Sequence, residues 1–308
     1  MNIASTLEND GAKPITAISP GNEAFSCSCG KPGCAFAALQ PIREHIARLY
    51  RAIAACDHES QLSQDWQAVL FPLQIAASIR DIDADTSYVD NTHSALYCES
   101  VAEYDDAHSD IARRYVAGVT VFTFLWRAYE AAVQLVWPDR LRRLWKEGNV
   151  GERGRRLFED FPDNFPSLRY LTNVARLAEF YCDEGKLFEK RLYAIREKLP
   201  DRDLKFSAEL CREFRNFITH GEDQVPEPAG WSGDGRQTNA RIYRLYAISR
   251  LLLLLIQAFA YSQLEGDPSD VEWGYDDDGE QLMASPKIVF ADLHLLDAAS
   301  EKGAVRSG

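Results

Sequence analysis

The segment from Leu204 to Gly221 carries a clear helical pattern, and it constrains the fold more than any other stretch. Its apolar residues recur every three or four positions, which is the spacing of one face of an amphipathic α-helix. These residues are Phe206, Leu210, Phe214, Phe217 and Ile218. Asp201 or Asp203 can cap the start of the helix. Gly221, followed soon by two prolines, predicts that the helix ends near His220.

The polar residues of this segment gather toward its C-terminal end. Arg212, Asn216 and His220 are spaced by four positions, so they share one face of the helix, and Arg215 lies beside that face. Histidine is the side chain whose charge most readily changes near neutral pH. The sequence therefore predicts two guanidiniums, an amide and a proton-transferring imidazole at one helix end.

The spacing of these residues resembles the signature of the HEPN ribonucleases. That signature is an arginine, a polar residue, a short spacer and a histidine on a helix of a small bundle. Here it reads Arg215, Asn216, three residues and His220, with Gly221 following. An arginine-to-histidine spacing alone also occurs by chance, so the flanking segments matter.

Two flanking segments agree with the same family. Residues 122–130 look like the aromatic-rich first long helix of such domains, and residues 241–264 look like the helix that closes the bundle. The resemblance covers roughly residues 110–264, about half of the chain. It implies an endoribonuclease that needs no metal or other cofactor for catalysis. It also implies a homodimer in which two motifs share a cleft, and a setting in toxin–antitoxin systems or antiviral defence, with an antitoxin or defence partner.

The chemistry of RNA cleavage suggests a role for each motif residue. RNA carries its own nucleophile, the 2′-hydroxyl, so the protein has to move protons and neutralise the phosphate. We expect His220 to be the general acid or base and Arg215 to bind the phosphate through its planar fork. Asn216 can orient His220 or the phosphate through its amide. The products should be a 2′,3′-cyclic phosphate and a 5′-hydroxyl.

Four residues outside the motif are candidates for supporting roles. Arg212 and Arg241 are candidates for contact with the substrate. Trp231 lies in a glycine- and proline-rich loop, where it can stack on a base or anchor the loop on the bundle. Glu130 can orient a guanidinium of the motif, or it can be an ordinary surface charge.

Two other functions fit the same sequence. Arg215 and His220 can simply cap a helix end and form salt bridges there, which makes the chain a non-catalytic HEPN-like module that dimerises or holds RNA or a partner protein. Alternatively, the chain is a regulatory protein stabilised by zinc, in which the cysteine cluster matters more than the helix motif.

The N-terminal region contains Cys27, Cys29 and Cys34 among glycine and proline turns. Such an arrangement resembles half of a structural zinc site, and free cysteines in a loose arm are the alternative. A fourth ligand could come from one of three residues. They are His45, Cys56 and His58.

The composition bears on partners and location. The formal net charge of -13 is unfavourable for indiscriminate nucleic-acid binding, because the long-range field repels phosphate. A ribonuclease would therefore depend on local basic clusters. These are Arg140, Arg142, Arg143, Lys146, Arg153, Arg155 and Arg156 in one cluster and Arg241, Arg244 and Arg250 in another. Seven cysteines with no secretion signal predict a reduced, cytoplasmic setting without a membrane span.

The overall prediction is an all-α protein with three parts. Residues 1–91 form an N-terminal arm with the cysteine cluster and helices, residues 92–265 form the HEPN-like bundle, and residues 266–308 form an acidic tail. Within the tail, alternating apolar residues at 287–296 predict a short strand or hairpin. The expected helices are 41–55, 64–79, 92–136 divided near Asp105, 168–181, 187–199, 204–220 and 241–264.

Overall fold

The computed structural model describes residues 35–59, 61–62, 65–89, 98–137, 150–231, 234–264, 270–275 and 281–296. The described chain is mostly helical, with one small pair of strands near the C-terminus, which confirms the all-α prediction. The helices are α2 (Ile42–His58), α3 (Gln67–Ser78), α4 (Glu99–Val136), α6 (Val150–Asp160), α7 (Leu171–Glu184), α8 (Glu189–Lys198), α9 (Leu204–Thr219), α10 (Gly235–Ser262) and α11 (Pro286–Asp292). Short 3-10 turns are η1 (Thr86–Val89) and η3 (Pro162–Asn164).

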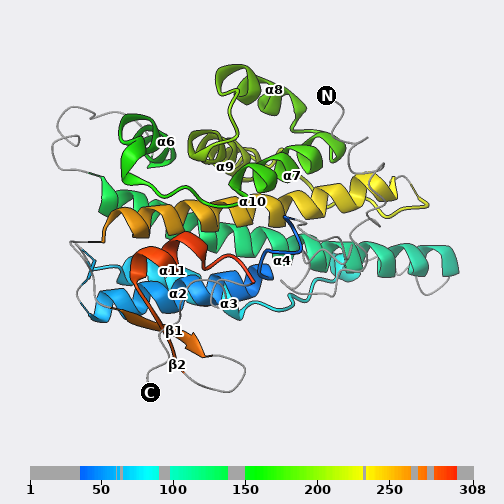
Figure 1. The fold of residues 1–308 in the computed structure, drawn as a ribbon. Helices are drawn as coiled ribbons and strands as arrows, with labels where there is room; N and C mark the ends of the chain where they lie inside the picture. Colours follow the sequence, from blue (N-terminus) through cyan, green and yellow to red (C-terminus); the bar gives the residue numbers. More distant parts are fainter. Residues whose placement is uncertain are drawn as a thin grey trace.

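Helix α10 is the centre of the fold. Figure 1 shows it running through the middle of the molecule, with α4 along one side and α7, α8 and α9 on the other. Its residues from Leu251 to Ile256 are each at most 1% exposed. A helix that is apolar all round has to be buried, either in a protein core or in a membrane. By length and composition α10 could cross a membrane, but 89% of its most apolar window is buried inside this fold.

Helix α4 is one continuous helix of 38 residues, so the predicted division near Asp105 is wrong. Side chains on either side of that point stabilise the helix. The rings of Tyr104 and His108 stack at 5.4 Å, an i,i+4 pair that bridges the expected break. The Tyr104 hydroxyl also donates to Glu227, 2.8 Å away in the loop before α10. Local polarity suggested a break, and these contacts keep the helix intact.

The C-terminal region contains a hairpin, but residues 287–296 are not its strand. The hairpin is formed by β1 (Val271–Tyr275) and β2 (Gln281–Ala284), which are antiparallel, with Val271 opposite Ala284. The predicted strand is instead the helix α11, which begins at Pro286. Proline is favoured in the first turn of a helix, because its missing N–H would be unpaired there anyway. Val289 and Phe290 are buried on this helix.

The N-terminal and C-terminal segments share one hydrophobic core with the central bundle. A buried polar chain also joins them. His45 of α2 lies 3.0 Å from the side-chain oxygen of Gln257 on α10. The Gln257 amide nitrogen donates to the Phe290 carbonyl at 2.7 Å and lies 3.1 Å from His294 Nδ1. His294 in turn reaches the Arg169 carbonyl at 2.9 Å. Helices α2, α10 and α11 are therefore held together by a hydrogen-bonded chain inside the core.

Candidate active site

Helix α9 carries the predicted motif, and its start follows from two local features. The Asp203 carboxylate accepts a hydrogen bond from the Phe206 amide at 3.0 Å, which is a side-chain N-cap. The apolar face then packs inward, with Phe214 and Phe217 at most 1% exposed. Phe188 contacts both of these rings edge-on, at 5.6 and 5.3 Å. The polar face is left at the surface of the bundle.

The C-terminal end of α9 is closed by a glycine in the left-handed conformation. Gly221 has a φ of 69°, and its amide donates to the Ile218 carbonyl at 3.0 Å. The next amide, of Glu222, reaches back to the Phe217 carbonyl at 3.1 Å. This pair of bonds is the Schellman motif. It confirms that the helix ends at His220, which is the C-cap residue.

The motif residues lie together on this helix end. Arg215 is half-buried, and its guanidinium lies 3.4 Å from the side-chain oxygen of its neighbour Asn216. His220 is exposed one turn further on. Within the described part of the chain, no carboxylate forms an ion pair with either Arg215 or His220. Among those residues, neither group is therefore neutralised by a carboxylate.

Arg212, expected to contact the substrate, is already engaged. Its Nε lies 3.0 Å from Glu209, and its guanidinium also binds Glu213. The Arg212 stem and the Trp126 ring both lie against Gly151 of α6. Burial would by itself raise the pKa of Glu209, but the hydrogen bonds and charge of Arg212 outweigh it and leave that pKa below its ordinary value. Arg212 thus neutralises a buried carboxylate.

Arg241, the other expected substrate contact, is engaged as well. Its guanidinium donates to the Asp223 carboxylate at 2.9 Å and to the Gln224 carbonyl. Arg244, one turn along α10, lies 2.6 Å from the same Asp223 oxygen. Both arginines therefore hold the loop that follows α9.

Sequence reasoning missed Arg191 of α8, which reaches the motif helix from the outside. Its guanidinium donates to Glu213 of α9 at 2.7 Å and to Glu222, two residues after His220. The acidic pair that follows Gly221 was a visible signal that a basic partner was needed. The identity of that partner depends on how α8 packs, which the sequence does not state.

Glu130 and Trp231 lie away from these contacts. Glu130 is half-buried on α4. The Trp231 side chain is 47% exposed and meets the Tyr104 ring edge-on at 5.7 Å, near the start of α4. No contact described for either residue joins it to Arg215 or His220. The Tyr104 contact favours loop anchoring for Trp231, while nearly half of its surface stays open.

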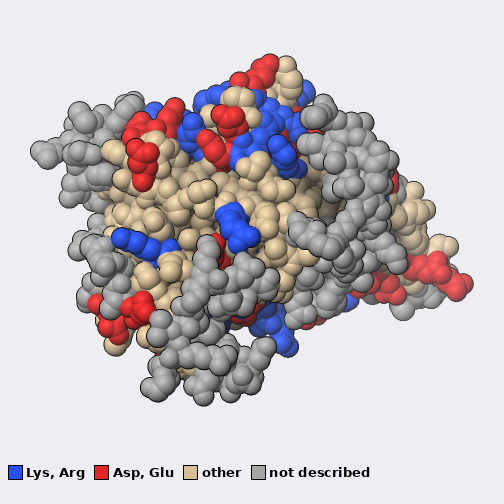
Figure 2. Space-filling model, in the orientation of Figure 1, with Lys and Arg blue, Asp and Glu red and all other residues tan. Residues whose placement is uncertain are grey.

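Charged side chains are mixed on the face that includes α7 and α8. Figure 2 shows lysine and arginine side chains gathered there, with acidic side chains among them. Several of these charges are paired, as in Arg196 with Glu179 at 2.7 Å and with Asp183. Mixed and paired charges reduce the attraction of this face for a polyanion.

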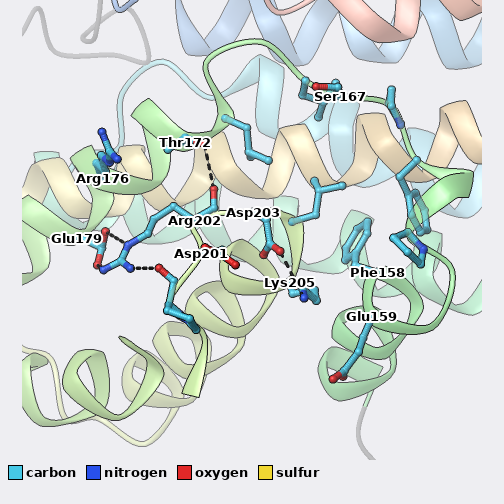
Figure 3. A pocket seen from close by; sticks show the side chains of 17 residues that line it. Phe158, Glu159, Ser167, Thr172, Arg176, Glu179, Asp201, Arg202, Asp203 and Lys205 are labelled. Carbon is cyan, nitrogen blue, oxygen red and sulfur yellow. Dashed lines mark hydrogen bonds and ion pairs between the residues drawn. The ribbon is translucent and has the colours of Figure 1, made fainter. Parts of the chain in front are cut away.

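A groove of about 1010 Å³ lies at the opposite end of α9 from the motif. Figure 3 shows its lining, in which Arg202 pairs with Glu179 and Lys205 lies near Asp203. The groove contacts the first residues of α7 and α9 and an apolar wall that includes Phe158. Helix α9 has 16 residues, so its two ends are about 24 Å apart. Of the predicted site residues that the structure describes, none lines this groove.

The predicted zinc ligands Cys27, Cys29 and Cys34 lie outside the described residues. Of the three candidates for a fourth ligand, His45 is fully buried and bonded to Gln257. Burial raises the pKa of the Cys56 thiol to about 12, which disfavours the thiolate that binds metal. His58 is exposed. In the part of the chain that the structure describes, no three His, Cys, Asp or Glu side chains converge as a metal site.

Comparisons with protein-family models, with curated proteins and with solved structures found no match to this chain. What marks this site is therefore the geometry of α9 and of the residues around its end. That geometry consists of an exposed imidazole, a guanidinium without a carboxylate partner among the described residues, and a surrounding set of ion pairs.

Proposed function

We propose that this protein is a metal-independent endoribonuclease of the HEPN type, with its site at the C-terminal end of α9. One observation carries the proposal. The arginines around the motif are matched by carboxylates, whereas Arg215 has no such partner among the described residues. The matched arginines are Arg191, Arg212, Arg241 and Arg244, and their carboxylates are Glu209, Glu213, Glu222 and Asp223. A guanidinium that the protein leaves unneutralised on the same helix end as an imidazole is suited to a phosphate.

The proposed mechanism divides the chemistry among three side chains. His220 transfers a proton, either from the 2′-hydroxyl or to the leaving 5′-oxygen. Arg215 donates parallel hydrogen bonds to the phosphate as negative charge develops on it. Asn216, whose oxygen lies 3.4 Å from the Arg215 guanidinium, holds that guanidinium in place. The motif contains no carboxylate to hold a metal, and in this mechanism the three side chains supply the proton transfer and the positive charge.

The proposal includes a two-fold homodimer. One helix end supplies one imidazole, whereas strand cleavage moves a proton on each side of the phosphate. A symmetric interface would place a second His220 in the same cleft. Light scattering should therefore give twice the chain mass at working concentration. A fully active monomer would contradict this part of the proposal.

The biological setting follows from the HEPN resemblance. We propose a toxin or antiviral defence effector acting in the cytoplasm, held in check by a partner protein. The net charge of -13 supports a selective substrate, because the long-range field opposes indiscriminate RNA binding.

The test is cleavage of RNA by the purified protein in EDTA. Wild-type protein should cut RNA and leave 2′,3′-cyclic phosphate ends. His220→Ala and Arg215→Ala should each reduce cleavage on the order of a hundredfold or more. His58→Ala removes another exposed histidine and serves as the matched control, with no expected change. DNA and 2′-O-methyl RNA should resist, because both lack the nucleophile.

The second candidate function is a non-catalytic HEPN-like module that binds RNA or a partner protein. The observation that favours it is the engagement of Arg212 and Arg241, which leaves one guanidinium of the predicted site for substrate. Such a module should bind RNA without cutting it. Binding that is equal for the wild type and for His220→Ala, with no cleavage by either, would favour this function.

A further inference from the structure

The loop that follows α9 is bound at each of its first three positions after Gly221. Glu222 binds Arg191, Asp223 binds two arginines of α10, and the Gln224 carbonyl accepts from Arg241. Each of these contacts lies within four residues of His220. The end of the motif helix is therefore fixed by side chains from α8 and α10 and not by the helix alone.

Asp223 is the most buried of these anchors. Its side chain is 0% exposed, as is that of Arg244, and the Arg241 side chain is 12% exposed. The Tyr115 hydroxyl faces the same carboxylate. Burial raises the pKa of Tyr115, and the nearby charge of Asp223 raises it further. A substrate at the surface cannot reach a carboxylate enclosed in this way.

Arg244 extends the same anchor to two other parts of the fold. Its guanidinium lies over the rings of Phe214 and Phe217, 5.8 and 5.3 Å from their centroids. It also donates to the Lys186 carbonyl at 3.0 Å, in the turn between α7 and α8. Asp223 and Arg244 thus connect the end of α9, helix α10 and the α7–α8 turn at one buried point.

We propose that Asp223, held by Arg241 and Arg244, is a positioning residue that sets the orientation of His220 and Arg215. The role of Arg241 changes accordingly. Its guanidinium is directed at Asp223 and the Gln224 carbonyl, so it orders the protein and does not bind RNA. The kinetic consequences rest on the proposed ribonuclease activity, while the structural consequence does not.

Arg241→Gln is the variant that tests this proposal. It leaves one carboxylate and one guanidinium in the buried cluster, which is a balanced pair, so the protein should still fold. Amide hydrogen exchange should rise roughly tenfold for peptides covering residues 216–224, because that end of the helix loses an anchor. The kcat for RNA should fall on the order of tenfold or more, because a small misplacement of the reacting groups is costly.

The separate effects of Arg241→Gln on kcat and on KM distinguish a positioning role from a role in substrate binding. A positioning role predicts a lower kcat with unchanged KM and unchanged dependence of KM on salt. A phosphate contact predicts a higher KM and a shallower salt dependence. Arg236→Gln is the matched control, because Arg236 lies on the same helix in an ion pair with Glu184 and is 58% exposed. It should change neither exchange nor kinetics.

Two results would overturn the proposal. One is unchanged exchange at residues 216–224 in Arg241→Gln. The other is a raised KM with a weaker salt dependence, which would make Arg241 a substrate contact. If the wild-type protein cuts no RNA, the proposed function fails, and the exchange measurement still decides whether the contacts of Arg241 with Asp223 and Gln224 hold the end of α9.

Discussion

Arg212 and Glu209 lie one turn apart on α9 and are joined by two hydrogen bonds of 3.0 Å, with the Glu209 side chain only 6% exposed. A nearly buried carboxylate needs a cationic partner, because water cannot reach it to compensate for the loss of that partner. This relationship separates two arginines that look alike in the sequence. Arg212 maintains the fold, and Arg215, three residues later, is half-buried and has no carboxylate partner in the described chain.

We therefore expect opposite effects from replacing these two arginines. Arg212→Gln should lower the free energy of unfolding by about 2–4 kcal/mol, because it leaves Glu209 without its closest cation. Arg215→Gln should change stability by no more than about 0.5 kcal/mol and should abolish most of the RNA cleavage. Urea denaturation of both variants measures the difference. Equal stability of the two variants would contradict the role of Arg212 in stabilising the fold.

The buried histidines predict that stability falls in mild acid. Burial lowers the pKa of His294 from its ordinary value of 6.5 to about 4, and burial also lowers the pKa of His45. Below pH 6.5 the unfolded chain therefore binds protons that the folded chain excludes, so the folded state loses stability as the pH drops. His294 alone accounts for up to about 3 kcal/mol between pH 6.5 and pH 4.

Denaturation midpoints measured across this range provide the check. His294→Gln removes one titrating group, so its stability should depend less steeply on pH than that of the wild type. The exposed His58 supplies the control, because His58→Gln should leave the slope unchanged. If the stability of His294→Gln depends on pH as steeply as that of the wild type, His294 does not cause the loss of stability in acid.

Gly221 should tolerate substitution according to backbone preference and not according to size. A Cβ added at this position would meet no atom within 4 Å, so only the positive φ of 69° opposes a side chain. Gly221→Ala should cost about 1 kcal/mol, and Gly221→Asn should cost less, because asparagine enters the left-handed region more readily. Thermal unfolding of the two variants compares them. A larger loss for asparagine would point to a steric role for this glycine.

The cysteine cluster gives a separate prediction. If Cys27, Cys29 and Cys34 bind a structural zinc, protein purified without chelators should contain about one zinc per chain. Elemental analysis of the wild type and of Cys29→Ser measures this. A wild-type preparation without zinc would leave these residues as free cysteines.

Local signals explain what the sequence could predict. The cap at Asp203 and the stop at Gly221 involve neighbouring residues, and the structure confirms both. Two other predictions were wrong, the break in α4 and the strand at residues 287–296. For α4, the sequence pattern did not show a contact with a distant residue. The Tyr104–Glu227 contact joins residues 123 positions apart. Alternating apolar residues also fit the helix that Pro286 begins.

The ion pairs around the motif could not be predicted from the sequence alone either. Arg241 and Asp223 are 18 positions apart, and Arg191 and Glu222 are 31 apart. Which arginine meets which carboxylate depends on how α8, α9 and α10 pack. The sequence identifies several cations near the motif, and only the packing shows which of them are already neutralised.

The most direct test of the central claim is an RNA digest with mapped product ends, run in EDTA with the wild type, Arg215→Ala and His220→Ala. We expect cleavage by the wild type alone, with 2′,3′-cyclic phosphate and 5′-hydroxyl ends. Circular dichroism of the variants confirms that they are folded. Undiminished cleavage by folded His220→Ala, or products bearing 5′-phosphates, would contradict a site built on the end of α9.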